Sequence, residues 1–260
     1  MRGHFRADWG IPMVVRAPRG WTRRFHPAPA AGMRLVVLPH AGGSASAYHS
    51  LSSALSPVID VHTVQYPGRQ DRLTEPVIDD LHVLAERLVE VVSALPRPFA
   101  LFGHSMGAAI AFEVARRLEA RDIVPAALFV SGRPGPGVHK EEWHHLSDDA
   151  AFLAEVNRLG GTDTTVLDDP DILDLVMPAL RGDYKAIETY RYRPGPGVSC
   201  PVVALTGDAD PVLDVRDVGN WRDHTTGSFE MEVFDGGHFF LDDHLDAVVA
   251  RIVGRLTVSP

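Results

Sequence analysis

A serine between two glycines is the first feature of the sequence that could do chemistry. Residues 103–107 read Gly-His-Ser-Met-Gly, after a short apolar run and before the small residues Ala108 and Ala109. A sharp turn from a strand into a helix needs glycine on both sides of the serine, because bulky neighbours would collide with both elements. Such a turn exposes the Ser105 hydroxyl above a helix N-terminus, which favours the negative charge that develops during acyl transfer. We predict Ser105 as a nucleophile, and a structural serine in a tight turn is the alternative.

A serine nucleophile needs a histidine that takes its proton and an acid that orients the histidine. With this kind of turn, the acid follows the serine along the chain and the histidine comes last, each after a later strand. Two acids, Asp208 and Asp210, follow the apolar run 202–205, and His238 ends the sequence Asp-Gly-Gly-His after the run 229–234. We predict His238 as the base because it lies in a glycine-rich loop between the last strand and the last helix.

The oxygen that becomes negative in acyl transfer needs two backbone N–H donors. One comes from the residue after the nucleophile, which is Met106, and the other from a loop that follows an early strand. Residues 39–44 read Pro-His-Ala-Gly-Gly-Ser, and glycines let the backbone approach a substrate closely. We predict the N–H groups of Ala41 and Met106 as an oxyanion hole, with a plain turn at 39–44 as the alternative.

The elements that must position these groups alternate along the chain, which predicts an α/β fold with a mainly parallel sheet. Apolar residues three and four positions apart predict helices at 78–95, 108–120 and 241–256. Each predicted catalytic residue lies in a loop after a predicted strand. The strands are predicted from apolar runs at 33–38, 58–64, 99–102, 127–130, 202–205 and 229–234.

The alternation stops between residues 133 and 197, where proline- and glycine-rich segments flank a helical stretch. We predict one α/β domain made of residues 21–132 and 198–260, interrupted by a helical insertion at 133–197. Residues 1–20 are predicted as a disordered N-terminal extension, because chain termini usually fray.

Five short segments together resemble the type II thioesterases of polyketide and nonribosomal peptide biosynthesis. They read LPHAGG at 38–43, YPGR at 66–69, GHSMG at 103–107, GDADP at 207–211 and GGHFFL at 236–241. The resemblance covers roughly residues 21–256 and implies an α/β-hydrolase fold in which the insertion is a helical lid. It implies a serine thioesterase that removes stalled or wrongly loaded acyl groups from the phosphopantetheine arm of acyl or peptidyl carrier proteins.

The resemblance also distinguishes the two acids, because the family pattern places the acid of the triad three residues after a glycine. Counted from Gly207, that residue is Asp210, and Asp208 is the second choice. Two other functions share these features. One is another lid-bearing serine esterase or acyltransferase. The other is a carrier-binding protein without catalytic activity, and the complete set of predicted catalytic residues argues against it.

The insertion carries enough apolar side chains to cover the serine and line an acyl chamber. We predict Phe152, Val176, Met177 and Leu180 as substrate contacts, and the alternative is that they only pack the insertion onto the core. The other apolar side chains considered for the same role are Leu153, Val156, Leu159 and Leu173.

Carrier proteins of these pathways are typically acidic, so docking to a chain of net charge −9 needs a local basic patch. We predict this patch at Arg19, Arg23 and Arg24, and the second choice is Arg69 with Arg72. Arg69 has an alternative role, which is to hold its own loop in place by hydrogen bonds.

The composition is that of an ordinary soluble globular protein, with 45% hydrophobic and 23% charged residues among 260. The net charge argues against a nucleic-acid partner, and no apolar run is long enough for a membrane helix. Cys200 is the only cysteine, so an internal disulfide is excluded and a cytoplasmic location is expected. The histidines at 139–145 lack the accompanying ligands of a metal site. We expect a monomer with no metal, no membrane partner and no cofactor of its own.

Overall fold

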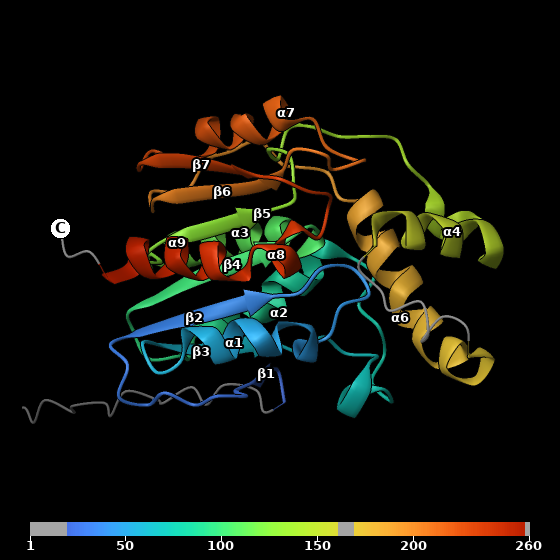
Figure 1. Cartoon of the computed structure of the whole chain (residues 1–260), viewed down its shortest axis with the longest axis horizontal. Coiled ribbons are helices and arrows are strands. Elements are labelled where there is room, and N and C mark those ends of the chain that lie inside the picture. Colours follow the sequence, from blue (N-terminus) through green and yellow to red (C-terminus); the bar gives the residue numbers. More distant parts are fainter. Residues whose placement is uncertain (1–19, 161–168, 258–260) are drawn as a thin grey trace, which may run out of the picture.

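The computed structural model describes residues 20–160 and 169–257 of the chain. In this part of the chain a seven-stranded sheet lies between two layers of helices, and a further pair of helices covers one end of the sheet (Figure 1). The strands are β1 (Thr22–Arg23), β2 (Met33–Leu38), β3 (Ile59–Val64), β4 (Phe99–His104), β5 (Leu128–Ser131), β6 (Val202–Gly207) and β7 (Phe229–Phe234).

The strands are arranged in the order β1-β3-β2-β4-β5-β6-β7. Neighbouring strands run parallel, except that β1 pairs with β3 in the antiparallel direction. All six residues of β3, β4 and β6 are buried, as expected for parallel strands that are covered on both faces. The predicted mainly parallel α/β fold is confirmed.

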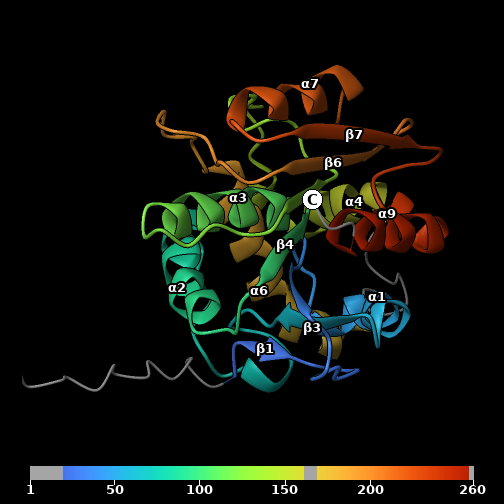
Figure 2. The ribbon, with the colours of Figure 1, turned by 90° about the vertical axis from the view of Figure 1, so that its left-hand side faces the viewer.

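Helices cover both faces of the sheet, and Figure 2 shows the two layers in a view along the strands. On one face, α2 and α3 bury their apolar stripes against β2 and β4 in the larger core cluster. On the other face, α1 and α9 pack through residues such as Leu55 and Ile252. The helices are α1 (His49–Leu55), α2 (Leu81–Ser93), α3 (Met106–Glu119), α4 (Asp149–Leu159), α6 (Pro170–Glu188), α7 (Val215–Gly219), α8 (Phe240–Asp243) and α9 (Leu245–Thr257).

Helices α4 and α6 lie beyond the ends of the strands that carry the predicted catalytic loops (Figure 1). They come between β5 and β6 in the chain, inside the segment predicted as the lid. Asp148 caps α4 by accepting a hydrogen bond from the Ala151 N–H, and Gly160 ends it with a left-handed φ of 84°. The two helices share a small apolar cluster of their own.

The sequence prediction misses the shortest elements and one break. The helices α1 and α7 have only seven and five residues, too few to show a clear periodicity. The predicted helix 241–256 is interrupted at His244, where α8 ends and α9 begins. The His244 Nε2 lies 2.7 Å from the carbonyl oxygen of Asp235, which ties this break to the loop after β7.

The predicted N-terminal extension lies outside the described residues except for Gly20, and the division into residues 21–132, 133–197 and 198–260 stays a prediction. Among the described helices, none combines the length and the hydropathy needed to cross a membrane.

Candidate active site

Ser105 occupies the sharp turn that the sequence predicts between β4 and α3. Its φ of 53° is in the left-handed region, which is strained for a residue with a side chain. The Ser105 N–H donates to the carbonyl oxygen of Ser131 at 2.8 Å. A Cβ at Gly103 would lie 2.1 Å from the Gly107 carbonyl oxygen, and a Cβ at Gly107 would lie 2.0 Å from that of Leu38. Both glycines are therefore required by close backbone contacts.

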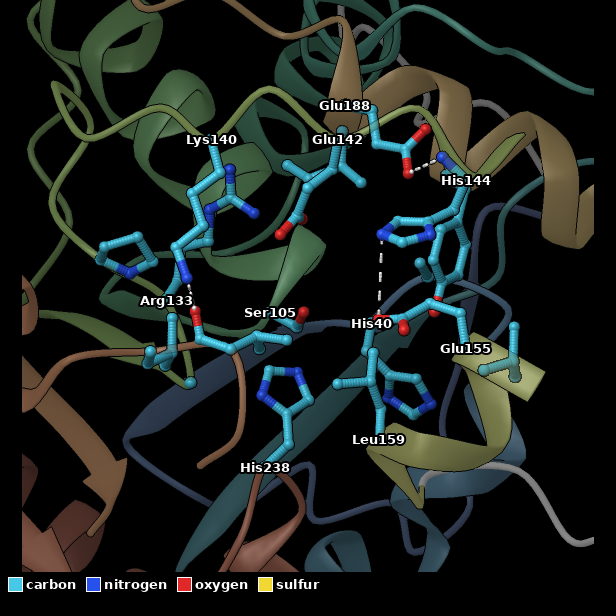
Figure 3. A pocket seen from close by; sticks show the side chains of 18 of the residues that line it. His40, Ser105, Arg133, Lys140, Glu142, His144, Glu155, Leu159, Glu188 and His238 are labelled. Atoms are coloured by element: carbon cyan, nitrogen blue, oxygen red, sulfur yellow. Dashed lines mark hydrogen bonds and ion pairs between the residues drawn. The ribbon is translucent and has the colours of Figure 1, made fainter. Parts of the chain in front are cut away.

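His238 and Asp210 form a buried pair beside this turn. The His238 Nδ1 lies 2.6 Å from the Asp210 Oδ2, and the two residues are only 4% and 8% exposed. The other carboxylate oxygen of Asp210 accepts a hydrogen bond from the Val212 N–H at 2.9 Å. This arrangement leaves the Nε2 of His238 available toward the cavity, and Figure 3 shows the Ser105 hydroxyl and the His238 ring facing each other across it.

Asp208 has a different position from Asp210. Its side chain is exposed, and its Oδ1 accepts a hydrogen bond from the Gly236 N–H at 3.0 Å. Asp208 therefore holds the loop that carries His238, whereas Asp210 contacts the imidazole itself. Asp210 thus contacts His238, and His238 lines the same cavity as Ser105, while the role of the three residues as a catalytic triad stays a prediction.

The two predicted oxyanion donors lie in the helix that follows Ser105 and in the loop that follows β2. Met106 is the first residue of α3, so its N–H is one of the helix N-terminal donors without a partner inside the helix. Ala41 lies in a tight turn that is closed by the Gly43 N–H and the His40 carbonyl oxygen at 3.0 Å. Both Ala41 and Ser105 line the same cavity.

Two further histidines lie close to His238 and its neighbour Phe239. The ring centroids of His104 and His238 are 5.0 Å apart, and His40 packs on Phe239 with a centroid distance of 4.8 Å. Burial, assisted by the charges of His238 and Arg69, lowers the pKa of His40 to about 3. Burial also lowers the pKa of His104 well below its ordinary value, with contributions from His238 and His40. Both rings are therefore neutral at pH 7.

The cavity above Ser105 has a volume of about 120 Å³ and lies between the core and the two lid helices. Its apolar wall comes from both parts of the chain. Val156 and Leu159, which the sequence analysis considered, line the cavity, together with Val138, Tyr184, Ile187, Val212, Leu213 and Phe239.

The four predicted substrate contacts Phe152, Val176, Met177 and Leu180 do not line this cavity. Phe152 and Leu180 are buried in the cluster between α4 and α6, and Met177 packs against it. Val156 and Tyr184 belong to the same cluster and also line the cavity. None of the four therefore contributes to the wall of this cavity, and Phe152, Met177 and Leu180 pack within the insertion, with Ala41 as the contact from the core.

A polar rim occupies the outer wall of the cavity, which the sequence analysis did not anticipate. It is formed by charged residues of the lid segment, including Arg133, Lys140 and Glu142 (Figure 3). The Lys140 Nζ donates to the Val212 carbonyl oxygen at 2.6 Å. Burial lowers the pKa of the Arg133 guanidinium from its ordinary value. The cavity thus combines an apolar wall with a charged rim.

The described arginines of the predicted docking patch form ion pairs or hydrogen bonds within the chain. Arg24 makes a bidentate contact with the buried carboxylate of Asp60 at 2.8 Å, and Arg23 pairs with Asp71. Arg72 pairs with Glu75 at 2.5 Å. Arg69 is 7% exposed and donates to the Gly43 carbonyl oxygen at 3.1 Å, so the alternative of loop fixation describes it. Arg19 lies outside the described residues.

We searched the described part of the chain for clusters of side chains that could bind a metal ion. In residues 20–160 and 169–257, no group of three or more His, Cys, Asp or Glu side chains is placed to hold a metal ion. The His145 ring instead contacts the Glu188 carboxylate, and Cys200 is a buried free thiol. The expected absence of a metal and of a cofactor stays a prediction.

Comparison with known proteins gives the family. The thioesterase domain family matches residues 33–256. The probable cadicidin biosynthesis thioesterase of Streptomyces griseus is 51% identical over 98% of this chain and 71% of its own length. The solved structure of BorB, the type II thioesterase from the borrelidin biosynthetic cluster, is 48% identical, with a TM-score of 0.85 over 91% of this chain and 97% of BorB.

YbtT, the type II thioesterase from the yersiniabactin NRPS/PKS biosynthetic pathway, is more distant in sequence but equally close in fold. It is 30% identical, with a TM-score of 0.83 over 91% of this chain and 98% of YbtT. The α/β-hydrolase fold implied by the sequence motifs is thereby confirmed. The chain therefore belongs to the thioesterase domain family and is one of the type II thioesterases related to those of polyketide and nonribosomal peptide biosynthesis.

Proposed function

We propose that this protein hydrolyses thioesters between an acyl group and the phosphopantetheine arm of an acyl or peptidyl carrier protein, and so clears stalled or aberrant acyl groups. The observation that carries the proposal is the strained Ser105 turn and the buried His238–Asp210 pair at one cavity, part of whose wall comes from α4 and α6. The family and its relatives in biosynthetic clusters support the thioester as substrate.

In the proposed reaction, the Ser105 Oγ attacks the thioester carbonyl carbon while the His238 Nε2 takes the hydroxyl proton. The carbonyl oxygen becomes negative and accepts hydrogen bonds from the N–H groups of Ala41 and Met106. The C–S bond then breaks, and the pantetheine sulfur leaves with the proton from His238. Asp210 stabilises the imidazolium and fixes the ring orientation throughout.

The second half of the reaction releases the acyl group. A water molecule gives a proton to His238 and attacks the Ser105 ester, with the same two N–H groups around the oxygen. The ester bond breaks, Ser105 recovers its proton from His238, and the acyl group leaves as a carboxylic acid. These steps need no cofactor bound to the enzyme, because the phosphopantetheine arrives on the partner protein.

The division of the cavity wall suits such a substrate. We assign the apolar wall around Val156, Leu159 and Ile187 to the acyl chain, and the charged rim to the amide-rich pantetheine arm. Movement of the lid helices would change the space available to the acyl chain along this wall.

The test compares carrier proteins loaded with acyl groups of increasing length against simple carboxylic esters, by their kcat/KM values. Ser105→Ala should lower kcat/KM on acyl-carrier substrates by about 10⁴- to 10⁶-fold while the melting temperature stays close to that of the parent. Faster turnover of esters than of acyl-carrier thioesters would favour a lipid-type esterase. An inactive parent protein that still binds carriers would favour the non-catalytic alternative.

A further inference from the structure

A buried ion pair connects the lid to the core directly beside the oxyanion loop. Arg69 follows β3, and Asp183 lies on the lid helix α6, 114 residues further along the chain. The Arg69 Nη1 and Nη2 donate to the Asp183 Oδ2 and Oδ1 at 2.6 Å and 2.8 Å. Asp183 is 1% exposed and Arg69 is 7% exposed. Burying two charges costs desolvation free energy, so such a pair is by itself a weak means of stabilising a fold.

The same two side chains also hold the peptide groups that follow Ala41. The Asp183 Oδ2 accepts a hydrogen bond from the Gly42 N–H at 2.7 Å. The Arg69 Nη1 donates to the Gly43 carbonyl oxygen at 3.1 Å. The ion pair is thus bonded to the loop at the Gly42 N–H and at the Gly43 carbonyl oxygen. Among the described residues, no other side chain forms a hydrogen bond with these two groups.

The lid helix also sets the shape of this loop by direct contact. Gly42 has a φ of 75°, and a Cβ there would lie 2.4 Å from the Leu180 Cδ1 of α6. At the start of the loop, the Tyr66 hydroxyl donates to the Pro39 carbonyl oxygen at 3.1 Å. Ala41 therefore lies between one anchor from the core and one anchor shared by the core and the lid.

We propose that Arg69 and Asp183 are positioning residues that aim the Ala41 N–H at the reacting oxygen, so that the lid helix α6 takes part in the catalytic step as well as covering the cavity. The proposal rests on the oxyanion role given to Ala41 in the proposed function. It follows that α6 cannot leave Gly42 without breaking the bond from Gly42 to Asp183, so the oxyanion hole is complete only when the lid helix is seated.

The first test measures kcat and KM for Asp183→Asn and Arg69→Gln on a small acyl thioester, which does not depend on carrier docking. Removing an oxyanion donor outright lowers kcat by about 10²- to 10³-fold, and loss of a positioning residue should cost less, about 10- to 100-fold. We expect KM to change by less than about 3-fold, because the loss is confined to the transition state. Binding of a boronic acid that mimics the tetrahedral intermediate should weaken in parallel with kcat/KM.

The matched control is the Arg24–Asp60 pair, which is also bidentate and has a buried carboxylate, but which lies away from the cavity. Asp60→Asn should lower the melting temperature and leave kcat unchanged. A kcat for folded Asp183→Asn equal to that of the parent would overturn the proposal. So would an equal loss of kcat in Asp60→Asn, because the effect would then be general destabilisation.

A double variant separates positioning from stability if the single variants fold poorly. Replacing both charges with apolar residues of similar size, Arg69→Met with Asp183→Leu, removes the buried charges together and often preserves stability. We expect this variant to fold and remain about 10- to 100-fold slow, and a folded double variant with the parent kcat would overturn the proposal. If Ser105→Ala retains full activity, the proposed function itself fails, which is a separate result.

Discussion

The His238 Nδ1 and the Asp210 Oδ2 lie 2.6 Å apart in a buried contact that joins the loop after β7 to the loop after β6. The contact fixes the imidazole so that its other nitrogen faces the cavity with Ser105. Asp208, two residues before Asp210, is exposed and bonds to the backbone of the histidine loop instead. The two carboxylates therefore have different roles although they lie in one short loop.

Asn substitutions at these two acids should have very different effects. Asp210→Asn preserves the shape but permits the wrong histidine tautomer, so kcat should fall by about 10⁴-fold. Asp208→Asn keeps an oxygen that can accept from the Gly236 N–H, so its kcat should stay within about 10-fold of the parent. Steady-state hydrolysis of an acyl thioester measures both. A larger loss in Asp208→Asn than in Asp210→Asn would reverse the assignment.

Enlarging a side chain that lines the cavity should change the preference for acyl length. Enlarging a side chain elsewhere on the lid helices should not. Val156→Phe adds volume at the cavity wall, so it should lower kcat/KM more for long acyl groups than for acetyl. Val176→Phe is the control, because Val176 is on α6, partly exposed and outside the cavity wall. Acyl-length profiles measured with both variants decide the point. Identical profiles for Val156→Phe and the parent would contradict the assignment.

Alanine should have opposite effects at two helical glycines. At Gly107 a Cβ would lie 2.0 Å from the Leu38 carbonyl oxygen, so Gly107→Ala should lower the free energy of unfolding by more than about 2 kcal/mol. Near Gly254, in α9, nothing lies within 4 Å of an added Cβ. Gly254→Ala should therefore raise the free energy of unfolding by about 0.5 to 1 kcal/mol. Urea denaturation measures both changes, and destabilisation by Gly254→Ala would contradict the second.

The buried histidine beside the nucleophile should make the fold sensitive to acid. The pKa of His104 is well below its ordinary value of 6.5 in the folded protein, mainly because of burial. Below pH 6.5 the unfolded chain therefore binds more protons at this site, and the stability present above pH 6.5 is lost as the pH falls.

His104→Asn should reduce this pH dependence. Between pH 6.5 and 5, one such group contributes a slope of at most about 1.4 kcal/mol per pH unit to the free energy of unfolding. The variant should show a smaller slope than the parent, with the remaining slope due to other buried histidines such as His40. Urea unfolding at several pH values measures the slopes, and equal slopes would show that His104 is not the source.

The sequence alone was sufficient for the parts of the site that depend on local chain geometry. The turn at Ser105 needs glycine at positions 103 and 107 because neighbouring backbone atoms leave no room for a side chain, and this requirement is visible as a motif. The parallel strands were equally visible, because burial on both faces demands continuous apolar runs such as β4 and β6. The choice of His238 followed from its glycine-rich loop after a strand.

Only the tertiary structure decided which lid side chains face the cavity and what Arg69 contacts. A helical pattern shows that α4 and α6 each have an apolar face, but it does not show that Val156 and Leu159 of their shared cluster line the cavity while Phe152 and Leu180 do not. The partner of Arg69 is Asp183, 114 residues away, and no local pattern relates the two. Steric contacts between chain neighbours restrict the residue types at those positions, so they can be read from the sequence. The packing of the lid depends on groups that come into contact only when the whole chain has folded.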